Sequence, residues 1–71
     1  MSGEELFDRG WTFKDFGPRK DGRWRCVGKV TLHTGETVEI ERRGDSQGAA
    51  RTACYDTASQ VQAVTEREAS K

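Results

Sequence analysis

The stretch from Trp24 to Leu32, W-R-C-V-G-K-V-T-L, alternates in character along its whole length. One face takes the even-numbered positions, which are Trp24, Cys26, Gly28, Val30 and Leu32. The other face takes the odd-numbered positions together with the preceding arginine, which are Arg23, Arg25, Val27, Lys29 and Thr31. Successive side chains of a β-strand point to opposite sides of the sheet. The pattern therefore predicts a strand with one buried face and a second, mostly cationic face toward solvent.

Another strand is expected upstream, over residues 11–16, with Trp11 and Phe13 on its buried face. Residues 17–22 between the two strands have loop chemistry, because they contain a proline and an Asp-Gly turn pair. The two strands are therefore expected to pair in antiparallel fashion.

A third strand is expected over residues 37–43, where Val38 and Ile40 point inward. A three-residue loop at 33–35, with Gly35 in the left-handed conformation of a bulge, joins it to the strand before. Facing residues of antiparallel strands must share a face, and this requirement fixes the register. The expected pairs are Val30 with Val38, Gly28 with Ile40, and Lys29 with Glu39 as a favourable cross-strand charge pair.

The only cover available for this sheet is a helix predicted over residues 46–64, with Asp45 or Ser46 as its N-cap. Its apolar positions recur at spacings of three and four and are mostly small, so the helix can approach the sheet closely. They are Ala50, Ala53, Cys54, Ala58, Val61 and Val64. The sequence thus predicts an α+β fold in the order β-β-β-α, a three-stranded antiparallel meander with one C-terminal helix packed on one face.

This outline divides the chain into a flexible N-terminal arm (1–10), a single β-β-β-α domain (11–65) and a frayed tail (66–71). The large apolar residues of the arm are Leu6 and Phe7, so it is expected either to fray or to form a short turn that docks Phe7. The total of 71 residues, with 32% hydrophobic content, allows one small core.

The charges balance, with 12 basic and 12 acidic residues, which excludes a uniformly basic nucleic-acid binder. Any such role must depend on how the charges are distributed. The sequence shows neither a secretory signal nor an apolar run of the ~20 residues that a membrane span needs. We therefore expect a cytoplasmic protein, with Cys26 and Cys54 as reduced thiols that face the core.

Basic residues gather on the outer face of the predicted sheet and in the loop before its second strand, and they are the candidate nucleic-acid-binding residues. They are Lys14, Arg19, Lys20, Arg23, Arg25, Lys29 and Arg43. From Lys14 to Lys29 there are six basic and two acidic residues, a local charge of +4. A β-ribbon can enter the major groove, and phosphate contacts supply most of the affinity. Phe16 and Val27 lie among these cations and are placed to contact a base. The same residues also fit a plain solvated face or a protein-binding face.

Other chemistry has little support in the sequence. The helix start near Gly44 and Gly48 is a second candidate for anion binding, but Asp45 already occupies the positive end of the helix dipole there. His33 is the single histidine, no CxxC motif occurs, and neither a catalytic triad nor a phosphate-binding glycine loop can be placed. We therefore expect a protein that is not an enzyme and has no cofactor and no metal.

Parts of the chain resemble three small families. Gly17-Pro18, Trp24 and Ser46-x-x-x-Ala50-Arg51-x-Ala53-Cys54 resemble the sheet and final helix of the double-stranded-RNA-binding domain. That family's helix-start lysine pair falls here on Gln47 and Gly48, and ten residues leave little room for its additional N-terminal helix. Gly22-Arg23-Trp24 and the segment 49–56 resemble the plant ethylene-response-factor type of DNA-binding domain, whose sheet reads the major groove. Gly44-Asp45-Ser46 before an alanine-rich helix is similar to antitoxin-type β-sheet domains. Each resemblance covers roughly half the chain.

The leading hypothesis is a small, non-enzymatic nucleic-acid-binding module that contacts phosphates through its basic sheet face and first loop. Duplex DNA is favoured over RNA, and a regulator from a mobile element is one role that fits. The alternative is a protein-interaction module, such as a homodimer, an inhibitor or an antitoxin, because the net charge is zero and the predicted sheet has exposed edge strands.

Overall fold

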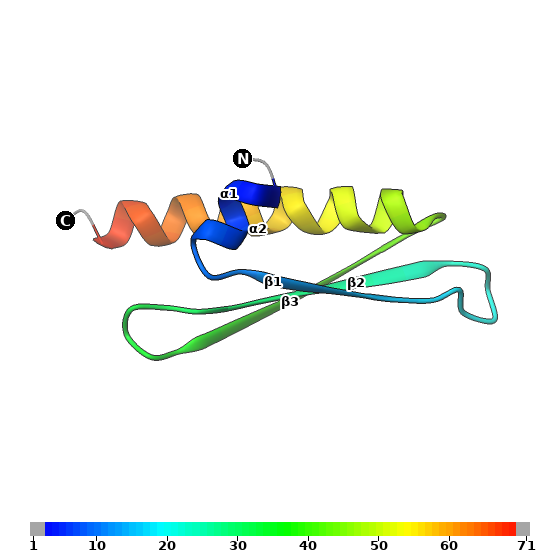
Figure 1. The fold of residues 1–71 in the computed structure, drawn as a ribbon, viewed down its shortest axis with the longest axis horizontal. Helices are drawn as coiled ribbons and strands as arrows, with labels where there is room; N and C mark the ends of the chain where they lie inside the picture. The colour runs from blue at the N-terminus through cyan, green and yellow to red at the C-terminus, as the bar shows by residue number, and fades with distance from the viewer. Residues whose placement is uncertain (1–2, 70–71) are drawn as a thin grey trace.

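The computed structural model describes residues 3–69, which form one antiparallel sheet with a long helix across one of its faces (Figure 1). The elements are α1 (Gly3–Asp8), β1 (Thr12–Phe16), β2 (Trp24–Thr31), β3 (Thr37–Gly44) and α2 (Gln47–Ala69). The strand order is β1-β2-β3, so the predicted meander and its C-terminal covering helix are confirmed. Within the described residues, none of the helices has both the length and the apolar character needed to span a membrane.

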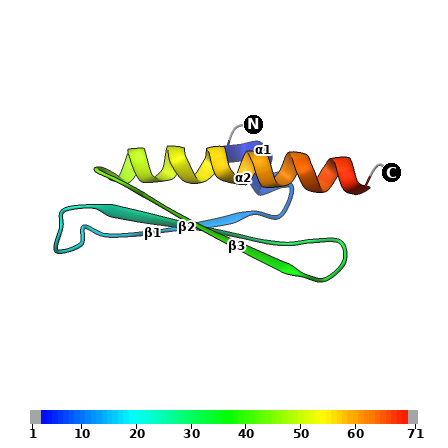
Figure 2. The same ribbon diagram turned by 180° about the vertical axis from the view of Figure 1, so that it is seen from behind.

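Both chain ends contain more helix than expected. A short helix, α1, lies beside α2 where a flexible arm (1–10) was predicted, and Figure 2 shows the same arrangement from behind. The apolar residue that α1 buries is Leu6, which is 0% exposed, whereas Phe7 is 48% exposed. An ion pair between Arg9 and Glu66 also joins the end of α1 to α2. At the other end, residues 66–69 of the predicted frayed tail belong to α2, while positions 1–2 and 70–71 lie outside the described residues.

The hairpin of β2 and β3 has the register that the sequence predicted. Gly28 faces Ile40, Lys29 faces Glu39 and Val30 faces Val38. The loop is closed by a 2.7 Å hydrogen bond that the amide of Leu32 donates to the carbonyl oxygen of Glu36. Gly35 has a φ of +93°, a left-handed conformation that favours glycine, so the loop holds the pairing in register.

A glycine in the middle of β2 lets two large side chains come close to the backbone of that strand. A Cβ at Gly28 would come within 2.8 Å of the Phe13 ring and 3.2 Å of the Ile40 side chain. Phe13 stacks on Trp11 with ring centroids 5.9 Å apart. The sequence predicted Ile40 as the cross-strand partner of this glycine, and the structure shows that the closest side chain is that of Phe13.

The core lies between the sheet and α2 and consists of two clusters. The first contains Leu6, Trp11, Val30 and Ala58, and the second contains Cys26, Ala50 and Cys54. The Trp11 indole donates a 3.0 Å hydrogen bond to Gln62, which satisfies the one polar atom of that buried side chain. Small residues on α2 let it lie close to the sheet, as predicted, and the sheet's aromatic residues supply the volume.

The start of α2 is fixed by a cap and a close approach. The amide of Ala49 donates a 3.1 Å hydrogen bond to Ser46 Oγ, so Ser46 is the N-cap. Gly44, the last residue of β3, lies directly against the first turn of the helix, because a Cβ there would be 2.5 Å from the backbone nitrogen of Ala50. The end of β3 therefore lies directly against the first turn of α2, because residue 44 has no side chain to separate them.

Candidate functional site

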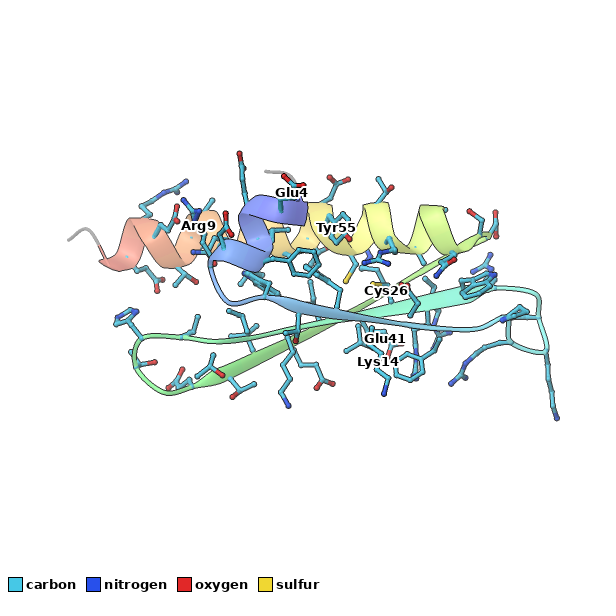
Figure 3. The ribbon with its side chains drawn as sticks, viewed as in Figure 1. Glu4, Arg9, Lys14, Cys26, Glu41 and Tyr55 are labelled. Carbon is cyan, nitrogen blue, oxygen red and sulfur yellow. The ribbon has the colours of Figure 1, made fainter. Side chains whose placement is uncertain are left out.

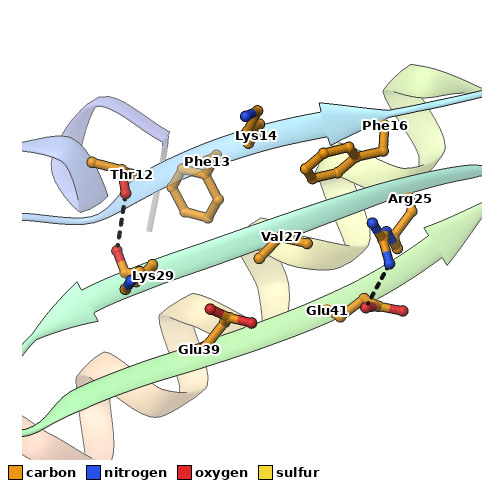
Figure 4. Close-up of a pocket in the computed structure, with 9 residues that line it drawn as sticks. All are labelled: Thr12, Phe13, Lys14, Phe16, Arg25, Val27, Lys29, Glu39 and Glu41. Atoms are coloured by element: carbon orange, nitrogen blue, oxygen red, sulfur yellow. Dashed lines mark hydrogen bonds and ion pairs between the residues drawn. The ribbon is translucent and has the colours of Figure 1, made fainter.

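The face of the sheet that α2 leaves uncovered forms a shallow hollow of about 550 Å³, here called the sheet hollow. Residues of all three strands line it, and Figure 4 shows them from outside. They are Thr12, Phe13, Lys14, Phe16, Arg25, Val27, Lys29, Glu39 and Glu41. Figure 3 shows Lys14 and Glu41 on the side of the sheet away from α2, with Cys26 on the helix side.

The sheet hollow has an apolar floor below a charged rim. Phe16 and Val27 are half-buried and form the floor together with the stem of Arg25. The rim residues are exposed and are Thr12, Lys14, Lys29, Glu39 and Glu41. The division of the β1 side chains between the two faces of the sheet follows from the register. Phe16 faces Arg25 across the β1–β2 pair on the outer face, whereas Phe13 faces Gly28 on the core side.

The rim charges are divided between the strands. Cationic Lys14 and Lys29 belong to β1 and β2, whereas anionic Glu39 and Glu41 belong to β3. Although Lys29 and Glu39 face each other in the register, they form no ion pair within residues 3–69, so the expected charge contact between them is not made. One side of the sheet hollow is thus positive and the other side negative.

Glu41 neutralises part of the cationic face. Its carboxylate lies 3.3 Å from Arg25 Nη1 and 3.5 Å from Arg43 Nε. Arg25 also lies over the Phe16 ring, 4.6 Å from its centroid, and Lys14 Nζ lies 5.4 Å from the same centroid. The Nε of Arg25 is enclosed and has no hydrogen-bond acceptor among the described residues. Arg25 is therefore held by Phe16 and Glu41, with one donor left unused.

The remaining predicted residues lie at one end of the sheet. Arg23 precedes β2 and approaches Asp45 at 3.6 Å, a pair in which both side chains are exposed. Arg19 and Lys20 are exposed in the loop, which is closed by a 2.8 Å hydrogen bond from the Gly22 amide to the Arg19 carbonyl oxygen. Three of the seven candidates, Lys14, Arg25 and Lys29, line the sheet hollow. The other four lie at the end of the sheet where Arg25 stands.

The neutral chain is electrically polarised between its two layers. Residues 11–44, which form the sheet and its loops, hold eight basic and five acidic residues, a net charge of +3. The helix α1 holds three acidic residues and no basic one, and α2 holds three acidic and two basic residues. A polyanion is therefore attracted toward the sheet side of the molecule.

The helix start does not form an anion site of its own. Arg51 donates a 3.0 Å hydrogen bond to Asp15 Oδ2, and Gln47 donates another at 3.0 Å to the same oxygen. These contacts direct Arg51 across to β1, away from the amides at the start of α2. The sequence predicted an ordinary capped helix start for this segment, and the observed Ser46 cap agrees with that prediction.

The two cysteines point into the core as predicted, and both are buried free thiols. Burial, with a hydrogen bond to Cys54 and the nearby charge of Asp15, raises the pKa of Cys26 to about 12. Burial also raises the pKa of Cys54. Both groups therefore stay protonated near neutral pH, where a thiol is a poor nucleophile.

Sequence reasoning missed the acidic side of the sheet hollow as part of a site. The alternation of Thr37, Glu39 and Glu41 places both carboxylates on the outer face, but the sequence prediction assigned a role only to Glu39, as the charge partner of Lys29. No protein-family model matches the chain, and no characterised protein or solved structure was found to be similar to it. The resemblances to the double-stranded-RNA-binding and ethylene-response-factor modules therefore stay predictions.

Proposed function

We propose that the protein is a non-enzymatic module that binds nucleic acid through the outer face of its sheet and the loop at 17–22. The observation that carries this proposal is the concentration of cations on the uncovered layer of a chain whose net charge is zero. Phosphate contacts by such cations release condensed counterions and supply most of the affinity in this class of interaction. A role as a regulator from a mobile element fits the size and the charge pattern.

Four of the cations are best placed to contact phosphates, because they are exposed and no carboxylate within residues 3–69 forms an ion pair with them. They are Lys14, Arg19, Lys20 and Lys29. Four phosphate contacts correspond to a slope of log K against log salt of roughly −3 to −4. Arg23, Arg25 and Arg43 are held by carboxylates and would add to the contact only by leaving them.

The proposal is tested by fluorescence anisotropy with labelled single strands and duplexes at about 50 mM salt. The double variant Lys14→Glu with Lys29→Glu is expected to bind at least about tenfold more weakly, because it removes two phosphate contacts and adds two repulsions. Arg67→Glu, an exposed basic residue of α2 on the other layer, is the matched control and should bind like the unchanged protein. Equal affinities for the double variant and the control, or no binding to any strand, would overturn the proposal.

The rival proposal is a protein-interaction module, and one observation favours it. The sheet is open, so β1 and β3 each have only one neighbouring strand among the described residues. Exposed edges can pair with a strand of another chain or of a second copy. A mass in light scattering that rises with concentration, together with anisotropy that does not respond to any nucleic acid, would select this rival.

A further inference from the structure

We propose that the sheet hollow takes a single unpaired nucleotide, with its base on the Phe16–Val27 floor, the amino edge of the base toward Glu39, and its phosphate toward Lys14 and Lys29. The inference deepens the proposed function and rests on it, since it names which form of nucleic acid the face selects. It favours single-stranded nucleic acid as the ligand, whereas the sequence pattern alone favoured duplex DNA.

The apolar floor inside the charged rim of the sheet hollow is the first argument. Phe16 and Val27 are half-buried, and exposed long side chains such as Lys14, Lys29 and Glu39 stand around them. The bases of a duplex are stacked and present only their edges in a groove, so they cannot descend between these side chains to an apolar floor. An unpaired base has a free π-face and can lie on that floor, where stacking is favourable for any base.

The division of charge across the sheet hollow is the second argument. Neighbouring strands lie about 4.8 Å apart, so β3, which carries the carboxylates, lies roughly 5 Å from β2 and roughly 10 Å from β1, which carry the ammonium groups. A nucleotide has the same polarity over a similar span, with an anionic phosphate at one end and base donors at the other. A site that bound phosphate groups alone would gain nothing from the carboxylate of Glu39, because a carboxylate repels phosphate.

The chemistry of Glu39 predicts which bases fit. A carboxylate accepts hydrogen bonds and repels phosphate, so its favourable partner on a base is an exocyclic amino group such as cytosine N4 or adenine N6. Thymine and uracil have no amino group. Glu39 makes no ion pair within residues 3–69, whereas Glu41 is already held by Arg25 and Arg43. Glu39 is therefore the residue expected to discriminate between bases.

The experiment compares labelled oligo-dC, oligo-dA and oligo-dT of about twelve nucleotides, together with a matched duplex, by anisotropy at low salt. Oligo-dC and oligo-dA are expected to bind about tenfold more tightly than oligo-dT and more tightly than the duplex, as one charge-assisted hydrogen bond provides. Glu39→Gln should reduce the dC-to-dT ratio toward one, because the amide can also donate to thymine O4. Glu36→Gln makes the same change in the turn before β3 and should leave the ratio unaltered.

A second measurement locates the base without any substitution. Methyl resonances of Val27 are expected to shift on addition of oligo-dC, because the ring current of a stacked base acts at the floor, and to stay unchanged with the duplex. Val27 methyls that do not move, or a dC-to-dT ratio of one, would overturn this inference. If the Lys14 and Lys29 reversals still weaken binding at least about tenfold in that case, the proposed function stands. The absence of binding to every strand at low salt would instead remove both proposals.

Discussion

Replacing Gly44 with alanine is expected to destabilise the fold strongly. A Cβ at this position would lie 2.5 Å from the backbone nitrogen of Ala50 and 2.8 Å from the carbonyl carbon of Ala49. Both atoms belong to the backbone of the first turn of α2, so they cannot move aside as the end of a flexible side chain does. The φ of Gly44 is not positive, so the expected effect is steric alone and involves no left-handed conformation.

The magnitude follows from the rigidity of these neighbours. Overpacking a well-packed site typically costs 1–3 kcal/mol, and we expect about 3 kcal/mol because the helix start must shift as a unit. A loss of this size is a large fraction of the stability of a small domain and lowers Tm by roughly 12–24 °C. Urea denaturation followed by tryptophan fluorescence measures it directly, because half-buried Trp24 is the cross-strand partner of Gly44.

A glycine four residues further along the chain provides the matched control. A Cβ at Gly48 would meet no heavy atom of the described residues within 4 Å, and Gly48 lies in the first turn of α2. Gly48→Ala is therefore expected to stabilise the protein by about 0.5–1 kcal/mol through helix propensity. The reasoning fails if Gly44→Ala unfolds within about 0.5 kcal/mol of the unchanged protein, or if both substitutions shift stability in the same direction.

Two further predictions concern the charged face and the core thiol. Glu41→Gln should release Arg25 and Arg43 for phosphate contact. The slope of log K against log salt should then become steeper by up to about 2. An unchanged slope would refute this. Because burial raises the pKa of Cys26 from 9.0 to about 12, the folded chain holds a proton that the unfolded chain releases in this range. Stability is therefore expected to fall as pH rises from 9.0 toward 12. In urea titrations Cys26→Ala should weaken this fall by up to about 1.4 kcal/mol per pH unit, and an equally steep fall would contradict the assignment.

Local pattern was sufficient for the three strands and for the register of the β2–β3 hairpin. The alternation of apolar and polar residues fixes which side of each strand is buried, and a slip by one residue between β2 and β3 would turn either Val30 or Val38 to solvent. The glycine at position 35 then favours a three-residue loop that satisfies this pairing. The helix was predictable for the same reason, since Ala50, Cys54 and Ala58 recur with its period.

Contacts between distant segments were not predictable from local pattern. The first ten residues carry no periodic signal, and Leu6 is buried only because α1 meets a site built by Trp11, Val30 and Ala58. The closeness of Phe13 to Gly28 likewise depends on the β1–β2 register, in which these two residues face each other. Such contacts are properties of the assembled core, because packing depends on shape in three dimensions.

The sequence by itself determined which side chains share the outer face of the sheet, because period-two alternation is a property of each strand alone. Its cations were therefore named correctly as outer-face or loop residues. Only the tertiary structure decided that Phe16 and Val27 form a floor, that Glu41 holds two arginines, and that Lys29 and Glu39 stay apart. Those outcomes depend on how far side chains reach across three twisted strands. Strand register alone does not determine which ion pairs form at an exposed surface, because such pairs are weak.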